Sequence, residues 1–114
     1  ICTPVGEYHL LPCLMMETFL LQIGYKVNNL APSAPTKSIT KYILENKPDL
    51  VLISITLKDN RNSAKRLLRE LTKLKIPILI GGQAVQNGDE FGNAKVLGSP
   101  KMTQLSKIIK KEIG

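Results

Sequence analysis

The uninterrupted apolar run at residues 49–54 is the feature that most constrains how this chain can fold. After Asp49 the run reads Leu-Val-Leu-Ile before it reaches Ser54, with no alternation of polar and apolar positions. A strand with one face in water would alternate, whereas a strand covered on both faces of a parallel sheet is apolar throughout. Parallel strands are joined by crossover connections, which are usually helices. The run therefore predicts an α/β fold, and the length of 114 residues predicts one domain, residues 1–114.

Further strands are predicted on both sides of this run. Residues 76–80 are a second apolar stretch, followed by Gly81 and Gly82. Shorter strands are expected at residues 1–3, 27–30 and 95–97. About five or six residues is the usual length of a strand, so residues 1–3 predict only the end of one. Because Ile1 is also not an initiator Met, we expect this domain to be part of a longer protein with a partner domain upstream.

The first predicted helix, residues 10–23, is almost entirely apolar. Pro12 is tolerated there because a residue in the first turn has no helical partner for its N–H group. A second helix is predicted before Lys47-Pro48, because Ile39, Tyr42 and Ile43 fall on one face.

Two more helices are predicted in the second half of the chain. Residues 62–74 carry apolar side chains at helical spacing. Residues 101–113 form the last helix, with Ser99 as its N-cap and Pro100 at the first helical position. The side chains that this helix should bury are Met102, Leu105, Ile108 and Ile109.

This alternation predicts a flavodoxin-like (Rossmann-like) doubly wound, five-stranded parallel sheet with strand order 2-1-3-4-5. In such sheets, ligands bind outside the carboxyl ends of the strands, where the winding direction switches. Here the switch is expected between the strands at residues 1–3 and 49–54. The loops that follow Thr3, Ser54 and Ile80 are therefore the candidate binding loops.

Composition excludes several classes of protein. The chain is 43% hydrophobic and 22% charged, which is typical of a globular domain and too apolar for a disordered one. No apolar run has the length of about 18 residues that a membrane span needs, and no secretion signal is present, so we expect a cytoplasmic protein. The net charge of +7 is spread over several segments, which favours solvated surfaces over a nucleic-acid site. Cys2 and Cys13 are expected to be reduced thiols.

The first candidate loop contains His9, the only histidine, two residues after Glu7. A single histidine cannot hold a bare zinc ion, which needs three or four protein ligands. It is sufficient for a metal whose equatorial ligands come from a macrocycle, and a carboxylate commonly fixes the second ring nitrogen of such a histidine. Gly81 and Gly82 would let a bulky ligand approach the backbone. Each feature alone has a plainer explanation: His9 as a surface residue, Ser54 as a cap and the glycines as a tight turn.

Together, the three loops resemble the cobalamin-binding domain family of methionine synthase, the cobalamin mutases, corrinoid methyltransfer proteins and MerR-type, CarH-like regulators. The family pattern is Asp-x-His-x-x-Gly, then Ser-x-Leu, then Gly-Gly. The corresponding residues here are Glu7-Tyr8-His9-Leu10-Leu11-Pro12, then Ser54-Ile55-Thr56, then Gly81-Gly82. The Thr-Pro-x-Gly-Glu-x-His run that begins at Thr3 is most similar to the regulator branch.

The resemblance implies that His9 is the metal ligand, replacing the dimethylbenzimidazole base below cobalt. It also implies that Glu7 orients His9, that Ser54 extends this relay, and that Thr56 and the glycine pair line a slot for the nucleotide tail. Pro12 departs from the family pattern, because it stands where the family has Gly. The cofactor-binding residues are then expected to be Gly6, Glu7, Tyr8, His9, Leu10, Pro12, Ser54, Thr56, Leu57, Gly81, Gly82 and Gln83.

The function expected from this resemblance is a non-catalytic sensor of adenosylcobalamin or methylcobalamin. Its partners would be an upstream helical bundle, an upstream DNA-binding domain and a second copy in a homo-oligomer, with no direct nucleic-acid or membrane contact by this domain. One alternative is a corrinoid carrier domain of a methyltransferase or mutase, where cobalt chemistry dominates. Another is a degenerate domain that no longer binds cobalamin, which the Pro12 substitution would explain.

Overall fold

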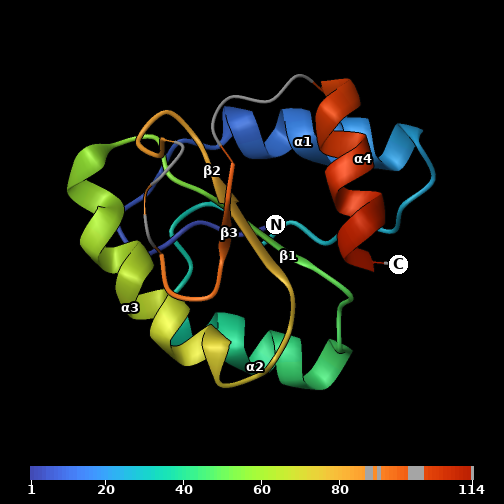
Figure 1. Cartoon of the computed structure of the whole chain (residues 1–114). Helices are drawn as coiled ribbons and strands as arrows, with labels where there is room; N and C mark the ends of the chain where they lie inside the picture. Colours follow the sequence, from blue (N-terminus) through green and yellow to red (C-terminus); the bar gives the residue numbers. More distant parts are fainter. Residues whose placement is uncertain (87–88, 90, 98–101, 114) are drawn as a thin grey trace.

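The chain folds around one parallel sheet whose strands alternate with helices (Figure 1). This computed structural model describes residues 1–86, 89, 91–97 and 102–113. In chain order the elements are α1 (Leu11–Gln22), α2 (Thr36–Asn46), β1 (Val51–Ser54), the short 3-10 helix η1 (Lys58–Asn60), α3 (Arg61–Thr72), β2 (Ile78–Gly81), β3 (Lys95–Val96) and α4 (Met102–Ile113).

The sheet has the order β1-β2-β3, and both pairs of neighbours are parallel. In the register of the first pair, Val51 lies opposite Ile78 and Ser54 lies opposite Gly81. Both strands therefore end at the same edge, and the loops that follow them begin side by side. This is the edge at which the sequence predicted a ligand site.

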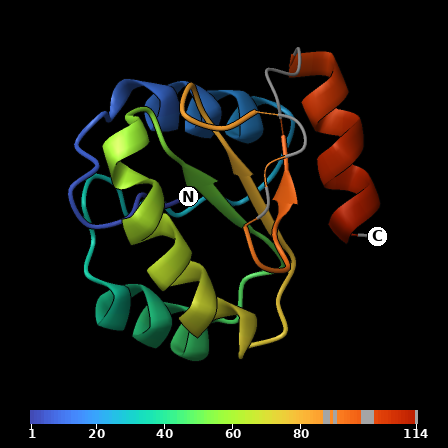
Figure 2. The same ribbon diagram turned by 60° about the vertical axis from the view of Figure 1, so that its left-hand side comes forward.

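Helices cover both faces of the sheet, which explains why its central strands are apolar throughout. Helices α2 and α3 lie on one face, and α1 and α4 lie on the other (Figure 2). Side chains of successive strand residues point to opposite faces. Thus Ile53 packs in the cluster with α2 and α3, whereas Leu52 packs against the cluster that contains α1 and α4 residues. The prediction that residues 49–54 and 76–80 contribute doubly buried strands is confirmed.

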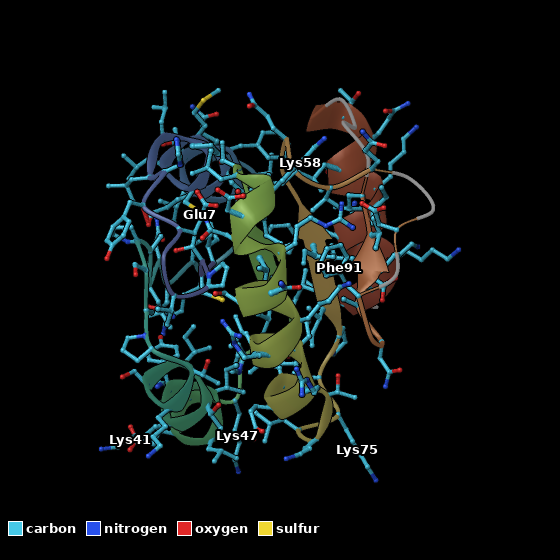
Figure 3. The ribbon with its side chains drawn as sticks, turned by 90° about the vertical axis from the view of Figure 1, so that its left-hand side faces the viewer. Glu7, Lys41, Lys47, Lys58, Lys75 and Phe91 are labelled. Carbon is cyan, nitrogen blue, oxygen red and sulfur yellow. The ribbon has the colours of Figure 1, made fainter. Side chains whose placement is uncertain are left out.

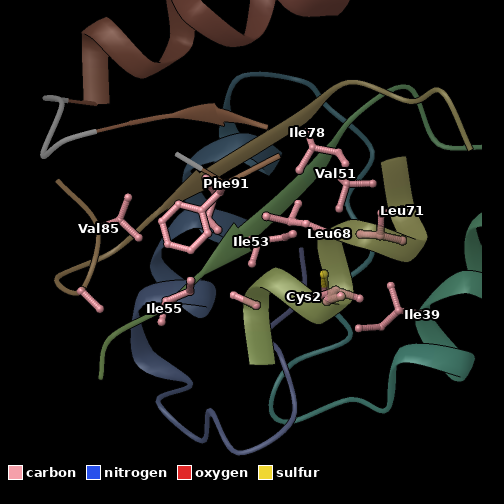
Figure 4. Close-up of a cluster of buried hydrophobic side chains, with 14 of the residues drawn as sticks. Cys2, Ile39, Val51, Ile53, Ile55, Leu68, Leu71, Ile78, Val85 and Phe91 are labelled. Atoms are coloured by element: carbon pink, nitrogen blue, oxygen red, sulfur yellow. The ribbon is translucent and has the colours of Figure 1, made fainter. Parts of the chain in front are cut away.

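The larger apolar cluster lies between the sheet and the α2–α3 layer (Figure 4). It joins residues distant in sequence, including Cys2, Ile39, Val51, Leu71 and Phe91. Each of these side chains is at most 6% exposed. Cys2 and Cys13 are buried free thiols in the structure, as expected.

Two of the five predicted strands are not formed as strands. Residues 1–3 contribute one isolated parallel bridge, between Cys2 and Ile53. Pro4 has no N–H group to extend that ladder, which accounts for its end. Residues 27–30 form no strand, although Ile1 donates its terminal amine to the Asn28 carbonyl at 2.9 Å and accepts from the Leu30 N–H at 2.8 Å. The sheet of the described residues thus has three strands, and the five-strand order remains a prediction.

The predicted helices are confirmed with small shifts at their ends. Pro12 lies in the first turn of α1, as expected. In α2 the buried residues are Ile39 and Ile43, and in α4 they include Leu105 and Ile109. The predicted cap at Ser99 and Pro100 lies outside the described residues, as does the side chain of Met102.

Candidate cofactor site

The loop between Thr3 and His9 is folded around the backbone of Glu7. The Glu7 N–H donates to the Pro4 carbonyl at 3.0 Å, which closes a turn. The Glu7 carbonyl accepts from the Thr3 hydroxyl at 3.1 Å and from the Ser33 N–H at 2.9 Å. These bonds anchor Glu7 to the buried start of the chain and turn its side chain inward. The side chain lies beside the first turn of α3 (Figure 3).

The Glu7 carboxylate is completely buried and surrounded by hydrogen-bond donors. Its Oε2 atom accepts from the Thr56 N–H at 3.0 Å, the Leu57 N–H at 3.3 Å and the Asn60 side-chain amide at 2.9 Å. A buried carboxylate without partners would be strongly unfavourable. Here donors from the loop after β1 and from η1 satisfy it, so a charge can be kept inside the fold.

The pKa of Glu7 is lowered from its usual value by the balance of two opposing effects. Burial raises the pKa because it penalises the charged form. The hydrogen bonds from Asn60, Leu57, Thr56 and His9 lower the pKa, and together they outweigh burial. Glu7 is therefore a carboxylate at neutral pH.

The ionised carboxylate determines the tautomer of His9. The Oε1 atom of Glu7 lies 2.8 Å from His9 Nδ1 and 3.4 Å from the His9 backbone N–H. A carboxylate can only accept hydrogen bonds, so the shared proton is on Nδ1 and the Nε2 atom of a neutral ring has a free lone pair. The His9 side chain is 47% exposed. The geometry thus offers one oriented imidazole nitrogen at the surface.

Exposed apolar side chains accompany His9 at this edge of the molecule. Tyr8 is 71% exposed, Leu11 66%, Val5 51% and Leu57 46%. They belong to the loops and the helix start that also position the Glu7–His9 pair. A large, partly apolar ligand with a metal at its centre would contact such a surface as well as the imidazole.

The third candidate loop, after β2, contains Gly82, whose missing side chain is required by the fold itself. Gly82 has a φ of +116°, and a Cβ atom there would lie 2.8 Å from Ile55 N and closer still to the Ile55 carbonyl oxygen. The chain is held in this position because Ala84 N–H donates to that carbonyl at 3.1 Å. A Cβ atom at Gly81 would meet only ordinary contacts, at 3.6 Å or more. The glycine that sequence reasoning assigned to ligand access therefore serves first to pack two backbones.

The predicted relay from Ser54 to Glu7 is wrong in detail. In the described part of the chain, the hydrogen bonds to the Glu7 carboxylate come from His9, Thr56, Leu57 and Asn60. The Ser54 side chain instead lies near the Cys13 thiol, where it acts against the rise in the pKa of Cys13 that burial causes. Strand alternation is the reason: Ser54 follows Leu52 by two residues and points to the same face, where α1 lies.

Asn60 is the site residue that sequence reasoning missed. It lies six positions after Ser54 and matches no part of the family pattern used above. Its polar side chain is only 9% exposed, a burial that becomes apparent only when η1 folds back over the Glu7 loop. Of the other predicted residues, Leu10 precedes α1 without a side-chain cap, Thr56 contributes its backbone N–H, and Gln83 is exposed.

The described residues contain neither a cluster of ligands for a bare metal ion nor a membrane-spanning helix. No group of three or more His, Cys, Asp or Glu side chains is arranged to hold a metal ion. None of the helices in that part of the chain is long and apolar enough to span a bilayer. Basic side chains are found at both ends of the molecule, with Lys58 near Glu7 and Lys41, Lys47 and Lys75 at the opposite end (Figure 3).

Comparison with known protein families matches the chain to the B12 binding domain over residues 1–98. The chain belongs to the B12 binding domain family. It is therefore a cobalamin-binding domain by family, as the sequence motifs implied. None of the curated protein sequences matches the chain significantly.

Solved structures show the same fold as this B12 binding domain. A cobalamin-binding protein from Desulfitobacterium hafniense DCB-2 matches with a TM-score of 0.79 and 20% identity, covering 99% of this chain and 57% of that one. The methanol:cobalamin methyltransferase complex MtaBC from Methanosarcina barkeri matches with a TM-score of 0.86 and 19% identity, covering 98% of this chain and 44% of that one. The domain thus spans about half the length of these structures. Neither is described as a transcriptional regulator, so membership of the regulator branch remains a prediction.

Proposed function

We propose that this domain binds cobalamin with its own base displaced, that His9 occupies the lower position on cobalt, and that the domain serves as a corrinoid carrier in methyl transfer. The observation that carries the proposal is the Glu7–His9 pair. A buried, ionised carboxylate holds Nδ1 at 2.8 Å and leaves Nε2 free on a half-exposed ring. One such nitrogen suits a metal that is already held by a macrocycle.

The residues present fit the cofactor chemically. His9 would supply the axial nitrogen, Glu7 would fix its tautomer and raise its basicity, and the exposed side chains of Tyr8, Leu11 and Leu57 would lie against the macrocycle. Cobalamin, when bound, supplies the cobalt centre for methyl transfer, and the protein contributes placement and tuning. Pro12, which stands where the family pattern has Gly, is exposed in the first turn of α1, and the helix forms with it there.

The carrier is preferred to the sensor that the sequence first suggested. Support comes from the likeness in fold to a methyltransferase complex, with a TM-score of 0.86 over 98% of this chain. The upstream helical bundle, the DNA-binding domain and the homo-oligomer belong to the sensor hypothesis and remain predictions. Methylcobalamin is the form that a methyl carrier would hold.

Cobalt ligation by His9 can be tested directly because it is the only histidine in the sequence. Untagged protein labelled with ¹⁵N-histidine should be loaded with cobalamin, reduced to the Co(II) state and studied by electron paramagnetic resonance. Ligation by His9 predicts that each three-line nitrogen splitting seen with ¹⁴N becomes a two-line splitting with ¹⁵N. His9→Ala should abolish the splitting by the protein nitrogen and weaken cobalamin binding. An unchanged splitting on labelling would refute ligation by His9.

The carrier and the sensor differ in their response to the upper ligand of cobalt. A sensor must bind at least two cofactor forms differently, because a ligand shifts an equilibrium only through differential affinity. Loading the domain with aquo-, methyl- and adenosylcobalamin and measuring affinity and mass by sedimentation should give similar values for a carrier. A change of oligomeric state with one form only would favour the sensor.

A further inference from the structure

Asn60 occupies the N-cap position of α3 but does not cap that helix. Asparagine is among the residues preferred at N-caps, where its side-chain oxygen accepts a backbone N–H bond from the first turn. In this structure the N-cap forms no such side-chain bond. The amide reaches the opposite way and donates from Nδ2 to Glu7 Oε2 at 2.9 Å. Asn60 thus lacks the usual capping bond and instead binds Glu7, which lies 53 positions away in the sequence. This indicates that its position serves the contact with Glu7.

The Glu7 loop is shaped to accommodate Asn60. Gly6 has a φ of +91°, and a Cβ atom there would lie 2.9 Å from Asn60 Oδ1. Any side chain at residue 6 would push the Asn60 amide away from Glu7. The loop backbone and the Asn60 side chain thus fit against each other directly, next to the carboxylate.

We propose that Asn60 is a positioning residue of the cofactor site, acting on His9 through Glu7. Asn60 and the Thr56 and Leu57 N–H groups hold Oε2, which leaves Oε1 facing His9 Nδ1 and Nε2 directed away from the carboxylate. The role that the sequence assigned to Ser54 is thereby carried by Asn60. The effect on His9 follows from the contacts of Asn60 and Glu7, and only its consequence for cobalt rests on the proposed function.

The donors to Glu7 Oε2 are of two kinds, backbone N–H groups and the Asn60 side-chain amide. The Thr56 and Leu57 N–H groups belong to the backbone and remain whatever their side chains are. Asn60 provides the side-chain donor to Oε2. It also belongs to a different element, so its bond ties the Glu7–His9 pair to the start of α3. Removing the Asn60 amide takes one charge-assisted hydrogen bond away from the buried Glu7 carboxylate.

The first experiment measures the tautomer of His9 in the protein without cofactor, by long-range ¹H–¹⁵N NMR of the imidazole at pH 8. The native protein should show mainly the Nδ1–H form, which is the minor form of an unrestrained neutral imidazole. Asn60→Leu, which keeps the size and removes the donor, should shift the population toward Nε2–H. The matched control is Asn62→Leu, an exposed position in the same helix, which should leave the tautomer unchanged. Identical tautomer populations in native protein and folded Asn60→Leu would overturn the proposal.

A double-mutant cycle separates action through Glu7 from general loosening of the site. In Glu7→Ala, His9 has no carboxylate beside Nδ1 and should show the mixed tautomers of an unrestrained neutral imidazole, so a further change would be visible in either direction. If Asn60 acts through Glu7, adding Asn60→Leu to this variant should cause no further change in tautomer. A further change of the same size as in the native background would mean that Asn60 acts by another route, and the proposal would fail.

A variant that leaves Asn60 in place covers the case in which Asn60→Leu does not fold. Gly6→Ala should displace the Asn60 amide and shift the tautomer in the same direction. Its control is Gly24→Ala, where φ is +97° but no atom lies within 4 Å of the added Cβ. Both variants place a side chain at a positive φ, which strains the backbone. Only in Gly6→Ala would the added Cβ also contact the Asn60 side chain. Equal tautomers in these two variants would contradict the proposal.

Cobalamin titration then separates this proposal from the proposed function. Asn60→Leu should lower the affinity for methylcobalamin about ten- to hundredfold, the usual effect of losing a group that orients a metal ligand. If native protein binds no cobalamin while the tautomer still depends on Asn60, the proposed function fails and the positioning role stands. If His9 ligates cobalt with equal affinity in native protein and Asn60→Leu, the positioning role fails and the proposed function stands.

Discussion

The two loops that meet at the carboxyl edge of the sheet are held by different forces. The Glu7–His9 loop is organised by polar bonds, with one buried carboxylate accepting from three separate segments of the chain. The loop after β2 is organised by the close approach of two backbones, where Gly82 lies against Ile55. The first loop places a reactive nitrogen and the second one shapes the edge of the sheet. Substitutions should therefore cost the most folding stability in the second loop, whereas substitutions in the first loop should cost less stability and should also change the state of His9.

The largest effect on stability is expected for Gly82→Ala. The added Cβ would collide with the backbone of Ile55, and Ala would also be strained at a φ of +116°. We expect the free energy of unfolding to fall by about 3 kcal/mol or more, as for other severe backbone clashes. Urea denaturation followed by circular dichroism measures this loss. Gly81→Ala is the matched control and should change stability by less than about 1 kcal/mol, because its Cβ meets only ordinary contacts. Equal effects of the two substitutions would remove the distinction between the loops.

A smaller loss of stability is expected for Glu7→Leu. This change removes the acceptor of the buried Asn60 amide and of the part-buried Thr56 and Leu57 N–H groups. One unsatisfied buried donor costs about 1–3 kcal/mol, and the part-buried N–H groups can turn to water instead, so we expect a loss in that range by urea denaturation. Glu7→Gln keeps an acceptor oxygen and should lose less. A full loss in Glu7→Gln would show that the charge of Glu7, rather than its acceptor atoms, stabilises the loop.

The contribution of Glu7 should also depend on pH. Folding lowers its pKa from the usual 4.5, so the unfolded chain binds this proton more readily than the folded one. The stabilisation is therefore present above pH 4.5 and is lost as the pH falls through the lower pKa of the folded state. Between pH 6 and pH 3 the native protein should lose more unfolding free energy than Glu7→Gln, as measured by urea denaturation at each pH. Parallel curves for the two proteins would contradict the assigned direction.

The smallest effect is expected for Ser54→Ala. Among the described residues, the Ser54 side chain lies near the Cys13 thiol and forms no hydrogen bond with the Glu7 carboxylate. A single neutral hydrogen bond contributes about 1 kcal/mol, so stability should change by that amount or less, and the His9 tautomer should not change. A shift of the tautomer in Ser54→Ala would restore the predicted relay and weaken the case for Asn60.

Much of the fold follows from pattern because burial on both faces has a direct signature in sequence. The apolar runs before Ser54 and Gly81 predicted the central strands, and helical spacing predicted α1 to α4 within one or two residues. The same reasoning wrongly predicted a strand at residues 27–30. An apolar stretch predicts burial, but a strand also needs a continuous ladder of partners, which only the assembled sheet can provide.

The residues of the candidate site can also be separated into those that the sequence predicted and those that only the fold brought together. By itself, the sequence determined that the chain is an α/β domain, that His9 and Glu7 lie two residues apart in a switch-point loop, and that two glycines follow a buried strand. The tertiary structure decided which groups meet: the Asn60 amide at the Glu7 carboxylate, Ser54 near Cys13, and the backbone of Gly82 against that of Ile55. The reason is physical. Periodicity and turn chemistry are local properties of the chain, whereas the partner of a buried polar group is set by the direction from which distant elements pack.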